Sequence, residues 1–256
     1  MSQPLQRPII LEHLKQSDAQ VEALAEELVR YTDDYGLILT HEQAVKCVLH
    51  LLYVEQVNSY INLTRITDLH EAVILHILDS LLIARYVPGE SDCFLDMGTG
   101  AGFPGVPAHI LTGKHGVLLD SVGKKVRAVE AIAHEIRLTG ISAVHARLED
   151  YALDVPERFD CVFARALAPS STLLEYAAPF LSMDGSLIVA KANMSADERS
   201  SADRVAALCG LDIVDQHEFD LPHALGHRVV QLFHKVRPAQ VSLPRAPGMA
   251  KRNPLA

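Results

Sequence analysis

The clearest chemical signature in the chain is a glycine-rich stretch at residues 94–105, FLDMGTGAGFPG. A short apolar run ends at Asp96, and glycines follow at alternate positions, Gly98, Gly100 and Gly102. Glycine adopts positive φ without strain and lets a ligand come close to the backbone. A helix that begins after such a turn offers free N–H groups to an anion. The stretch therefore predicts a strand, a tight turn and a helix that together bind a charged cofactor.

Two classes of cofactor fit this turn. Gly100, Gly102 and Gly105 match the dinucleotide fingerprint G-x-G-x-x-G. The strand, however, ends near Asp96, so Gly98 opens the turn, and an acid at that point would repel a pyrophosphate. The register D-x-G-x-G-x-G suits S-adenosylmethionine better, because Asp96 can meet its amino group directly or through water. We favour S-adenosylmethionine and keep an NAD(P)-dependent oxidoreductase as the alternative.

Carboxylates also follow the next two apolar runs. Asp120 ends the second run, which places a carboxylate where the ribose diol of either cofactor would lie. Leu148 and Glu149 follow the third run, where a backbone amide and an apolar neighbour suit adenine. The spacing of these residues predicts one cofactor site at the carboxyl edge of a sheet.

These residues resemble the motifs of the bacterial 16S rRNA guanine-N7 methyltransferases, the glucose-inhibited division protein B family. The resemblance runs from about residue 58 to the C-terminus. Further segments are similar to the family in the same order, namely Asn62–Thr64 with His76–Ser80, Leu119–Ser121 with Gly123–Arg127, Ala164–Ala166, Lys191, and a basic tail from Pro244 to Leu255. A non-catalytic rRNA-binding or assembly factor with the same fold is the second alternative.

The resemblance implies transfer of a methyl group to N7 of one guanine in the decoding-region loop of 16S rRNA, in the small ribosomal subunit. It implies S-adenosyl-L-methionine as the cofactor. It also assigns the cofactor contacts, to which we add Gly100 and Ser121 from the same motifs. The full set is Gly98, Gly100, Phe103, Asp120, Ser121, Leu148, Glu149 and Arg165.

The proposed methyl transfer requires few catalytic side chains. A sulfonium already activates the methyl group, so the protein must chiefly align donor and acceptor. Guanine N7 carries a free lone pair, and we therefore expect neither a general base nor a metal. Arg165 is the candidate for positioning, through the methionyl carboxylate or an RNA phosphate. The alternative is a buried ion pair of Arg165 with Asp96 or Glu149.

The helix before the glycine loop carries polar side chains at helical spacing. His76, Asp79 and Ser80 share one face of an otherwise apolar helix. They either close the cofactor pocket or form a His–Asp pair that holds the helix to the core.

The charge of the chain is uneven. The formal net charge is −9, yet residues 221–256 contain no acid and carry +6, which leaves −15 on the rest. An acidic body excludes general attraction to nucleic acid, so RNA contacts must be local. We expect them from basic residues near the pocket and in the tail, namely Arg65, Lys124, Lys125, Arg127, Lys191, Arg245, Lys251 and Arg252.

The tail allows two interpretations. If it contacts RNA, removal of residues 237–256 weakens substrate binding and flattens its salt dependence but leaves affinity for S-adenosylhomocysteine unchanged. If it packs on the domain instead, it matters for folding.

The elements that must position these residues form an α/β pattern. Residues 1–88 predict a helical N-terminal extension with helices over 18–35, from a cap at Thr40 to about 57, and over 69–87. Residues 89–236 alternate short apolar runs with amphipathic stretches at 124–138, 171–181 and 196–208. Residues 237–256 form the basic tail. The pattern predicts a class I methyltransferase, a Rossmann-like, mostly parallel sheet.

Seven apolar runs supply its strands, and the last two leave little room for a helix between them, so we expect an antiparallel pair at one edge. The runs cover 93–95, 117–119, 143–144, 161–163, 187–189, 213–214 and 229–233.

Composition sets the remaining expectations. The four cysteines form no C-x-x-C pair, which disfavours a zinc ribbon or thioredoxin motif. Neither a signal peptide nor an apolar stretch long enough for a membrane span is evident. We expect a cytoplasmic monomer without membrane or metal.

Overall fold

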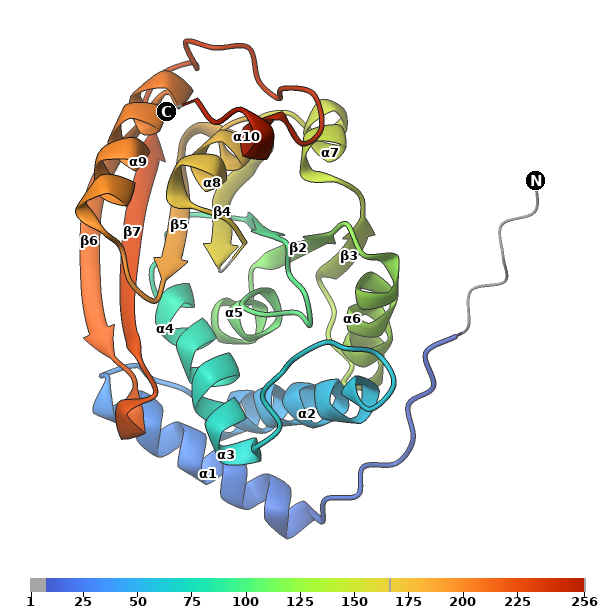
Figure 1. The fold of residues 1–256 in the computed structure, drawn as a ribbon. Helices are drawn as coiled ribbons and strands as arrows, with labels where there is room; N and C mark the ends of the chain where they lie inside the picture. Colours follow the sequence, from blue (N-terminus) through green and yellow to red (C-terminus); the bar gives the residue numbers. More distant parts are fainter. Residues whose placement is uncertain (1–7, 166, 256) are drawn as a thin grey trace, which may run out of the picture.

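The computed structural model describes residues 8–165 and 167–255, so Ala166 lies outside the described residues. A seven-stranded sheet runs through the molecule with helices on both sides (Figure 1). Its strand order is β3-β2-β1-β4-β5-β7-β6, and β7 is antiparallel to both of its neighbours while the other pairs are parallel. The expected mostly parallel sheet with an antiparallel pair at one edge is confirmed.

Each strand contains one of the apolar runs, extended by a few residues. The strands are β1 (Cys93–Met97), β2 (His115–Asp120), β3 (Ile141–His145), β4 (Phe159–Arg165), β5 (Leu181–Lys191), β6 (Leu211–Asp220) and β7 (His227–Lys235).

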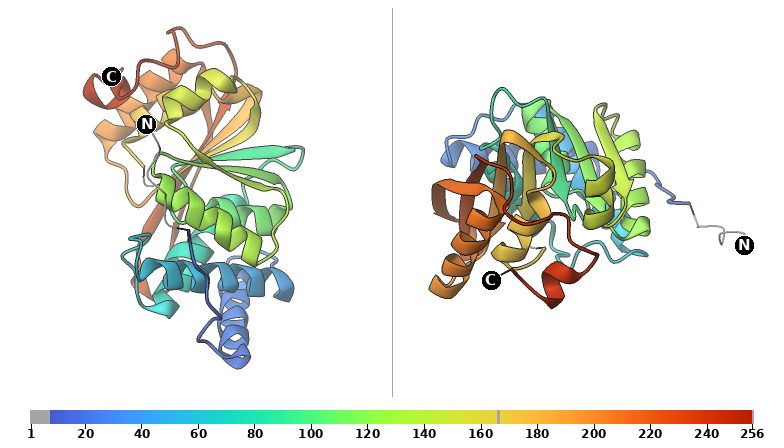
Figure 2. Two further views of the ribbon diagram at one scale, coloured as in Figure 1. Left: turned by 90° about the vertical axis from the view of Figure 1, so that its right-hand side faces the viewer. Right: turned by 90° about the horizontal axis from the view of Figure 1, so that it is seen from above.

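Helices cover both faces because successive strand residues point to opposite sides. In β1, Phe94 packs with residues of α4 and α5, whereas Leu95 packs with residues of α7, α8 and α9. Figure 2 shows the sheet between these two layers. The helices are α4 (Asp79–Ala84), α5 (Gly105–Thr112), α6 (Gly123–Glu135), α7 (Leu148–Asp154), α8 (Ser170–Ala177) and α9 (Ala196–Cys209).

The N-terminal helices begin at capping boxes. Ser17 precedes α1 (Asp18–Asp34) and Thr40 precedes α2 (His41–Asn58), and each accepts a hydrogen bond from a backbone N–H three residues later. The expected cap at Thr40 is confirmed. The reciprocal glutamine at each box satisfies a second backbone donor, so both helix starts are fixed by local sequence.

The third N-terminal helix differs from the expectation. The sequence predicts a regular helix over 69–87, but the structure has α3 (Leu69–Ala72), a π-helical turn (Val73–Leu78) and then α4, which ends at Ala84. A π-helical turn inserts an extra residue and rotates the next turn of helix, and such turns are frequent at functional sites. Here the turn contains His76 and is followed directly by Asp79.

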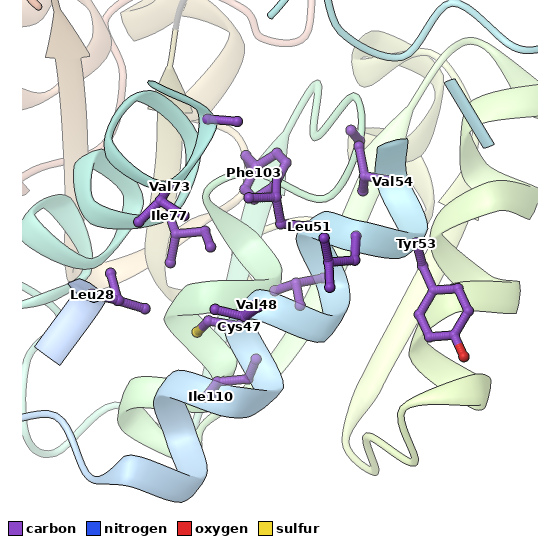
Figure 3. Packing of buried hydrophobic residues seen from close by; sticks show 14 of the residues in the cluster. Leu28, Cys47, Val48, Leu51, Tyr53, Val54, Val73, Ile77, Phe103 and Ile110 are labelled. Carbon is purple, nitrogen blue, oxygen red and sulfur yellow. The ribbon is translucent and has the colours of Figure 1, made fainter. Parts of the chain in front are cut away.

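These helices share a core with the sheet domain. Leu28, Val48 and Ile77 form one buried cluster with Ile110 of α5 (Figure 3). Phe103 of the glycine loop belongs to the same cluster and lies between α2 and the π-helical turn in Figure 3. The N-terminal helices thus pack against the glycine loop through Phe103. The boundaries at residues 88 and 236 stay predictions.

The remaining elements are short. A 3₁₀ turn (Pro222–Ala224) joins β6 to β7, and α10 (Met249–Arg252) is the last element of the described chain.

The four cysteines are free thiols: Cys47, Cys161 and Cys209 are buried, and Cys93 is half-buried. Within residues 8–165 and 167–255, no helix has the length and hydropathy that a membrane span requires, and no cluster of three or more potential metal ligands is present.

Candidate functional site

The glycine loop has the conformation that its sequence predicts. Gly98, Gly100 and Gly102 all have positive φ, at 73°, 61° and 94°. The N–H groups of Gly98 and Thr99 donate to the carbonyl oxygen of Leu119 at 2.8 and 3.0 Å, which ties the loop to β2. A Cβ at Gly100 would have no neighbour nearer than 4.0 Å. The backbone at Gly100 is therefore open to a ligand.

Asp96 is held by the loop itself. Its Oδ2 atom accepts hydrogen bonds from the Thr99 hydroxyl at 2.6 Å and from the Gly105 N–H at 2.8 Å, and the side chain is buried. Burial raises the pKa of Asp96 to about 6, partly offset by these hydrogen bonds. One oxygen of this carboxylate thus fixes the turn to the start of α5, which the expectation of contact with the cofactor amino group did not include.

Asp120 joins the second strand to the same loop. Its Oδ2 accepts the Gly100 N–H at 3.0 Å, and its Oδ1 accepts the Val122 N–H at 2.8 Å. The side chain is buried at the carboxyl end of β2. Asp120 therefore combines two features that a ribose diol requires, a fixed carboxylate and a position beside the glycine loop.

Five of the eight expected cofactor residues line one cavity of about 320 Å³, which we call the donor cavity. These are Gly98, Asp120, Ser121, Leu148 and Glu149. Gly100 contacts this group through its hydrogen bond to Asp120.

The donor cavity also has walls that the sequence reasoning missed. Leu167 stands directly over Gly98, since a Cβ there would lie 2.7 Å from Leu167 Cδ1. Tyr176 lines the cavity from α8, and Gly248 and Lys251 line it from the C-terminal tail. Leu167 follows the fourth strand at the same sheet edge, which topology would have indicated. The tail residues carry no comparable signal, because their position depends on a long-range contact.

Phe103 and Arg165, the other two expected cofactor residues, lie outside the cavity lining. Phe103 packs between two histidines, with its ring centroid 4.6 Å from that of His50 and 4.8 Å from that of His76. The His76 ring is stacked on it at 10°. The guanidinium carbon of Arg165 lies over the same ring, 6.0 Å from its centroid. Phe103 therefore anchors the loop through the two histidines, and Arg165 lies near this anchor.

Burial keeps both histidines neutral. The His50 Nε2–H donates to the Ala101 carbonyl at 2.9 Å, and burial lowers the pKa of His50 to about 3. His76 Nε2 is hydrogen-bonded to Thr64 Oγ1 at 2.7 Å, and burial followed by the charge of Arg165 lowers its pKa to about 4. The expected polar face on the third helix exists, but His76 pairs with Thr64 and not with Asp79.

Arg165 lines a second cavity, of about 570 Å³, which we call the cationic cavity. It lies over the carboxyl ends of β4 and β5 and the start of β7. Its polar lining residues are His76, Asp79, Arg165, Lys191, Asn193 and Arg228. Because β7 runs antiparallel, its first residues meet the last residues of β4 and β5 at one edge. That topology could have indicated Arg228, which the sequence reasoning missed.

Asp79 is the electrostatic centre of the cationic cavity. Its Oδ2 accepts from Arg165 Nη1 at 3.0 Å and its Oδ1 accepts from Arg228 Nε at 2.9 Å, and Asp79 is 3% exposed. The ion-pair interpretation of Arg165 therefore holds, but with Asp79 and not with Asp96 or Glu149. Lys191 pairs with Glu198 at 2.7 Å. Three cations face two carboxylates, so the cavity is locally positive in an acidic protein.

The other basic residues expected to bind RNA are scattered. Arg65 and Lys124 are exposed, and Lys125 is half-buried. Lys124 and Arg127 line a groove of about 920 Å³ beside residues 8–16 and α2, away from the glycine loop. Arg245 forms a buried ion pair with Glu175, and Arg252 donates to the Pro247 carbonyl. Among the described residues, the structure thus brings Lys191 together with Arg165 and Arg228 at the cationic cavity, and Lys124 together with Arg127 at the separate groove.

Comparisons with known proteins agree with this geometry. The family model described as rRNA small subunit methyltransferase G matches residues 43–222. The chain is 36% identical over 220 residues to Ribosomal RNA small subunit methyltransferase G of Desulfitobacterium hafniense, covering 85% of this chain and 91% of the relative. It is 32% identical over 237 residues to the protein of that name from Leuconostoc citreum, covering 90% and 99%.

Solved structures share the fold at low identity. Pyrococcus horikoshii TYW2 in complex with MeSAdo aligns with a TM-score of 0.51 at 12% identity, over 63% of each chain. NSun6 from the same organism, with SFG, aligns with a TM-score of 0.50 at 15% identity, over 62% of this chain and 52% of that one. With its fold, its glycine loop and relatives of this identity and coverage, the chain belongs to the rRNA small subunit methyltransferase G family.

Proposed function

We propose that the protein is an S-adenosylmethionine-dependent methyltransferase that methylates N7 of a guanine in the decoding-region loop of 16S rRNA. The observation that carries this proposal is the donor cavity. In a chain of this family, an open glycine loop and a buried carboxylate on the next strand border a cavity at the carboxyl edge of the sheet. The name of the relatives supplies the rRNA of the small subunit as substrate class.

The donor cavity fits the groups of this cofactor. Asp120 presents a fixed carboxylate for a ribose diol, and there is open space where a side chain at Gly100 would stand. Leu148 and Glu149 line the same cavity from the start of α7, where an adenine would meet an apolar side chain and a backbone amide. When bound, S-adenosylmethionine supplies a methyl group that its sulfonium has already activated.

We place the acceptor base at the cationic cavity. Arg165 lines it and also lies over the ring of Phe103 in the glycine loop, so a base there would lie next to the donor. Guanine presents O6 and N7 as acceptors, and Arg or Lys side chains commonly donate to them. Asp79 and Glu198 hold the cations of this cavity in place. Because N7 has no proton to lose, these residues need only orient the base and exclude water.

Labelled methyl transfer tests the proposal. Small subunits and naked 16S rRNA, both lacking the modification, are incubated with the protein and tritiated S-adenosylmethionine, and the labelled nucleoside is identified after digestion. We expect 7-methylguanosine from one site in the decoding-region loop. A protein that binds the subunit but transfers no label would be an assembly factor, and a protein stabilised by NAD but not by S-adenosylhomocysteine would be an oxidoreductase. Cytoplasmic location and a monomeric state stay predictions.

A further inference from the structure

The C-terminal tail packs against the domain beside the donor cavity. Figure 1 shows it crossing from the end of β7 to α10, which lies near α7 and α8. Ala250 is 2% exposed in the buried cluster under α8, and Leu243 and Leu255 pack against that cluster. Of the two interpretations of the tail, the structure therefore supports the one in which the tail packs on the domain.

A two-point ion pair anchors the tail. Arg245 donates from Nε to Glu175 Oε1 at 2.7 Å and from Nη2 to Glu175 Oε2 at 2.6 Å. Glu175 is 4% exposed, and the hydrogen bonds to it raise the pKa of Arg245. A bidentate pair of this kind fixes direction as well as distance. It sets where the chain goes three residues later, at Gly248.

Gly248 then joins the tail to a cofactor residue. Its N–H donates to Glu149 Oε1 at 2.7 Å, and its φ of 79° turns the chain into α10. One helical turn further, Lys251 lines the donor cavity together with Asp120 and Glu149. The tail therefore adds a basic residue to a cavity that Asp120 and Glu149 already line.

We propose that the tail is a wall of the donor cavity and that Lys251 is a cofactor-binding residue, donating hydrogen bonds to oxygen or ring-nitrogen acceptors of the adenosyl group. This inference rests on the proposed placement of S-adenosylmethionine. Arg245 is a positioning residue, because it anchors the tail through Glu175 and does not line the cavity, and Gly248 fixes the Glu149 side chain where the tail meets the cavity. The tail then contributes to cofactor affinity, contrary to the expectation that its removal leaves that affinity unchanged.

The test is calorimetric titration with S-adenosylhomocysteine in the absence of RNA. Lys251→Ala is expected to weaken binding roughly tenfold, as for one hydrogen bond from a charged group. Arg237→Ala is the matched control, because Arg237 carries the same charge in the same terminal segment but pairs with Asp212 at the surface. We expect its affinity to stay within about twofold of the wild type.

A second variant separates positioning from stability. Arg245→Gln is expected to raise the KM for S-adenosylmethionine while kcat and the KM for small subunits stay near wild type, whereas general unfolding would lower all activity. The midpoint of urea unfolding without ligand identifies any variant that fails to fold, and Lys251→Ala, an exposed position, keeps the test available.

Asp120→Ala distinguishes the two possible failures. If Asp120→Ala weakens S-adenosylhomocysteine but Lys251→Ala does not, the tail inference is wrong. If Lys251→Ala raises only the KM for small subunits, the tail is an RNA contact and the inference is overturned as well. If Asp120→Ala itself binds normally, the proposed placement of the cofactor fails instead.

Discussion

The donor cavity and the cationic cavity lie at the same edge of the sheet, but different kinds of group shape them. Backbone groups shape the first, since Gly98, Gly100 and Val122 supply N–H donors within a few residues of the strand ends. Side-chain ion pairs shape the second, since Asp79 pairs with Arg165 and Arg228, the latter 149 positions away in the chain. The glycine-loop side of the first cavity therefore depends on local conformation, whereas its tail wall and the second cavity depend on tertiary packing.

The largest expected effect concerns the backbone of the donor cavity. Gly98→Val introduces a β-branched side chain at φ 73°, where a Cβ would also lie 2.7 Å from Leu167 Cδ1. We expect no measurable binding of S-adenosylhomocysteine by calorimetry, in a protein whose circular dichroism shows the native helix content.

Gly113→Ala is the control, because Gly113 has φ 70° with open space around it and ends α5 away from the cavity. Normal affinity in a folded Gly98→Val protein would show that the ligand site lies elsewhere.

Substitution of Asp79 in the cationic cavity is expected to lower the stability of the protein. Asp79→Ala leaves two arginines, 16% and 14% exposed at their side chains, without their shared carboxylate. Breaking a buried pair from one side is expected to lower the free energy of unfolding by about 3 kcal/mol. Urea unfolding measures this loss, and S-adenosylhomocysteine affinity should change much less. A loss of affinity with unchanged stability would reverse the assignment of the two cavities.

The histidines beside Phe103 predict acid lability. His50 and His76 are neutral in the fold, with pKa values of about 3 and 4 against an ordinary 6.5. Below pH 6.5 these two histidines are protonated in the unfolded chain but stay neutral in the folded protein, so the free energy of unfolding falls as pH falls. Asp96, with its pKa raised to about 6, acts in the opposite sense between pH 6 and 4.

The two histidines destabilise the fold on acidification and the one carboxyl stabilises it. The free energy of unfolding is therefore expected to fall by about 1.4 kcal/mol for each unit that the pH falls between 6 and 4. Urea unfolding at pH 6.0, 5.0 and 4.5 measures the slope, and His76→Gln should remove most of it. A stability that rises on acidification over this range would contradict the neutral histidines.

The smallest effect is expected at the surface. Lys124→Ala combined with Lys125→Ala should reduce the slope of log affinity for small subunits against log salt by about 2, if each lysine contacts one phosphate. Lys46→Ala is the control, because Lys46 is half-buried on α2 and already pairs with Glu42. An unchanged slope would confine RNA binding to the cationic cavity.

The same contrast explains what the sequence can predict. The glycine loop, the capping residues and the seven strands follow from short-range rules, because glycine spacing and apolar runs act within a few residues. The donor residues of β1, β2 and α7 could be predicted because parallel strands end at one edge.

Three features lie beyond those rules. The π-helical turn at Val73–Leu78 shifts the register of Asp79, which helical spacing of 3.6 residues does not indicate. The partner of Arg165 depends on how α4, which follows that turn, packs against β4. The course of the tail depends on Arg245 meeting Glu175, 70 positions earlier, and no local pattern in the tail specifies such a partner.

Steady-state methyl transfer to unmodified small subunits tests the central claim most directly, with KM measured for each substrate in the wild type, Asp120→Ala and Lys191→Ala. If donor and acceptor occupy separate cavities, Asp120→Ala raises the KM for S-adenosylmethionine roughly tenfold and leaves that for subunits unchanged. Lys191→Ala does the reverse. A wild-type protein that transfers no methyl group, or two variants in which both KM values rise together, would contradict the account.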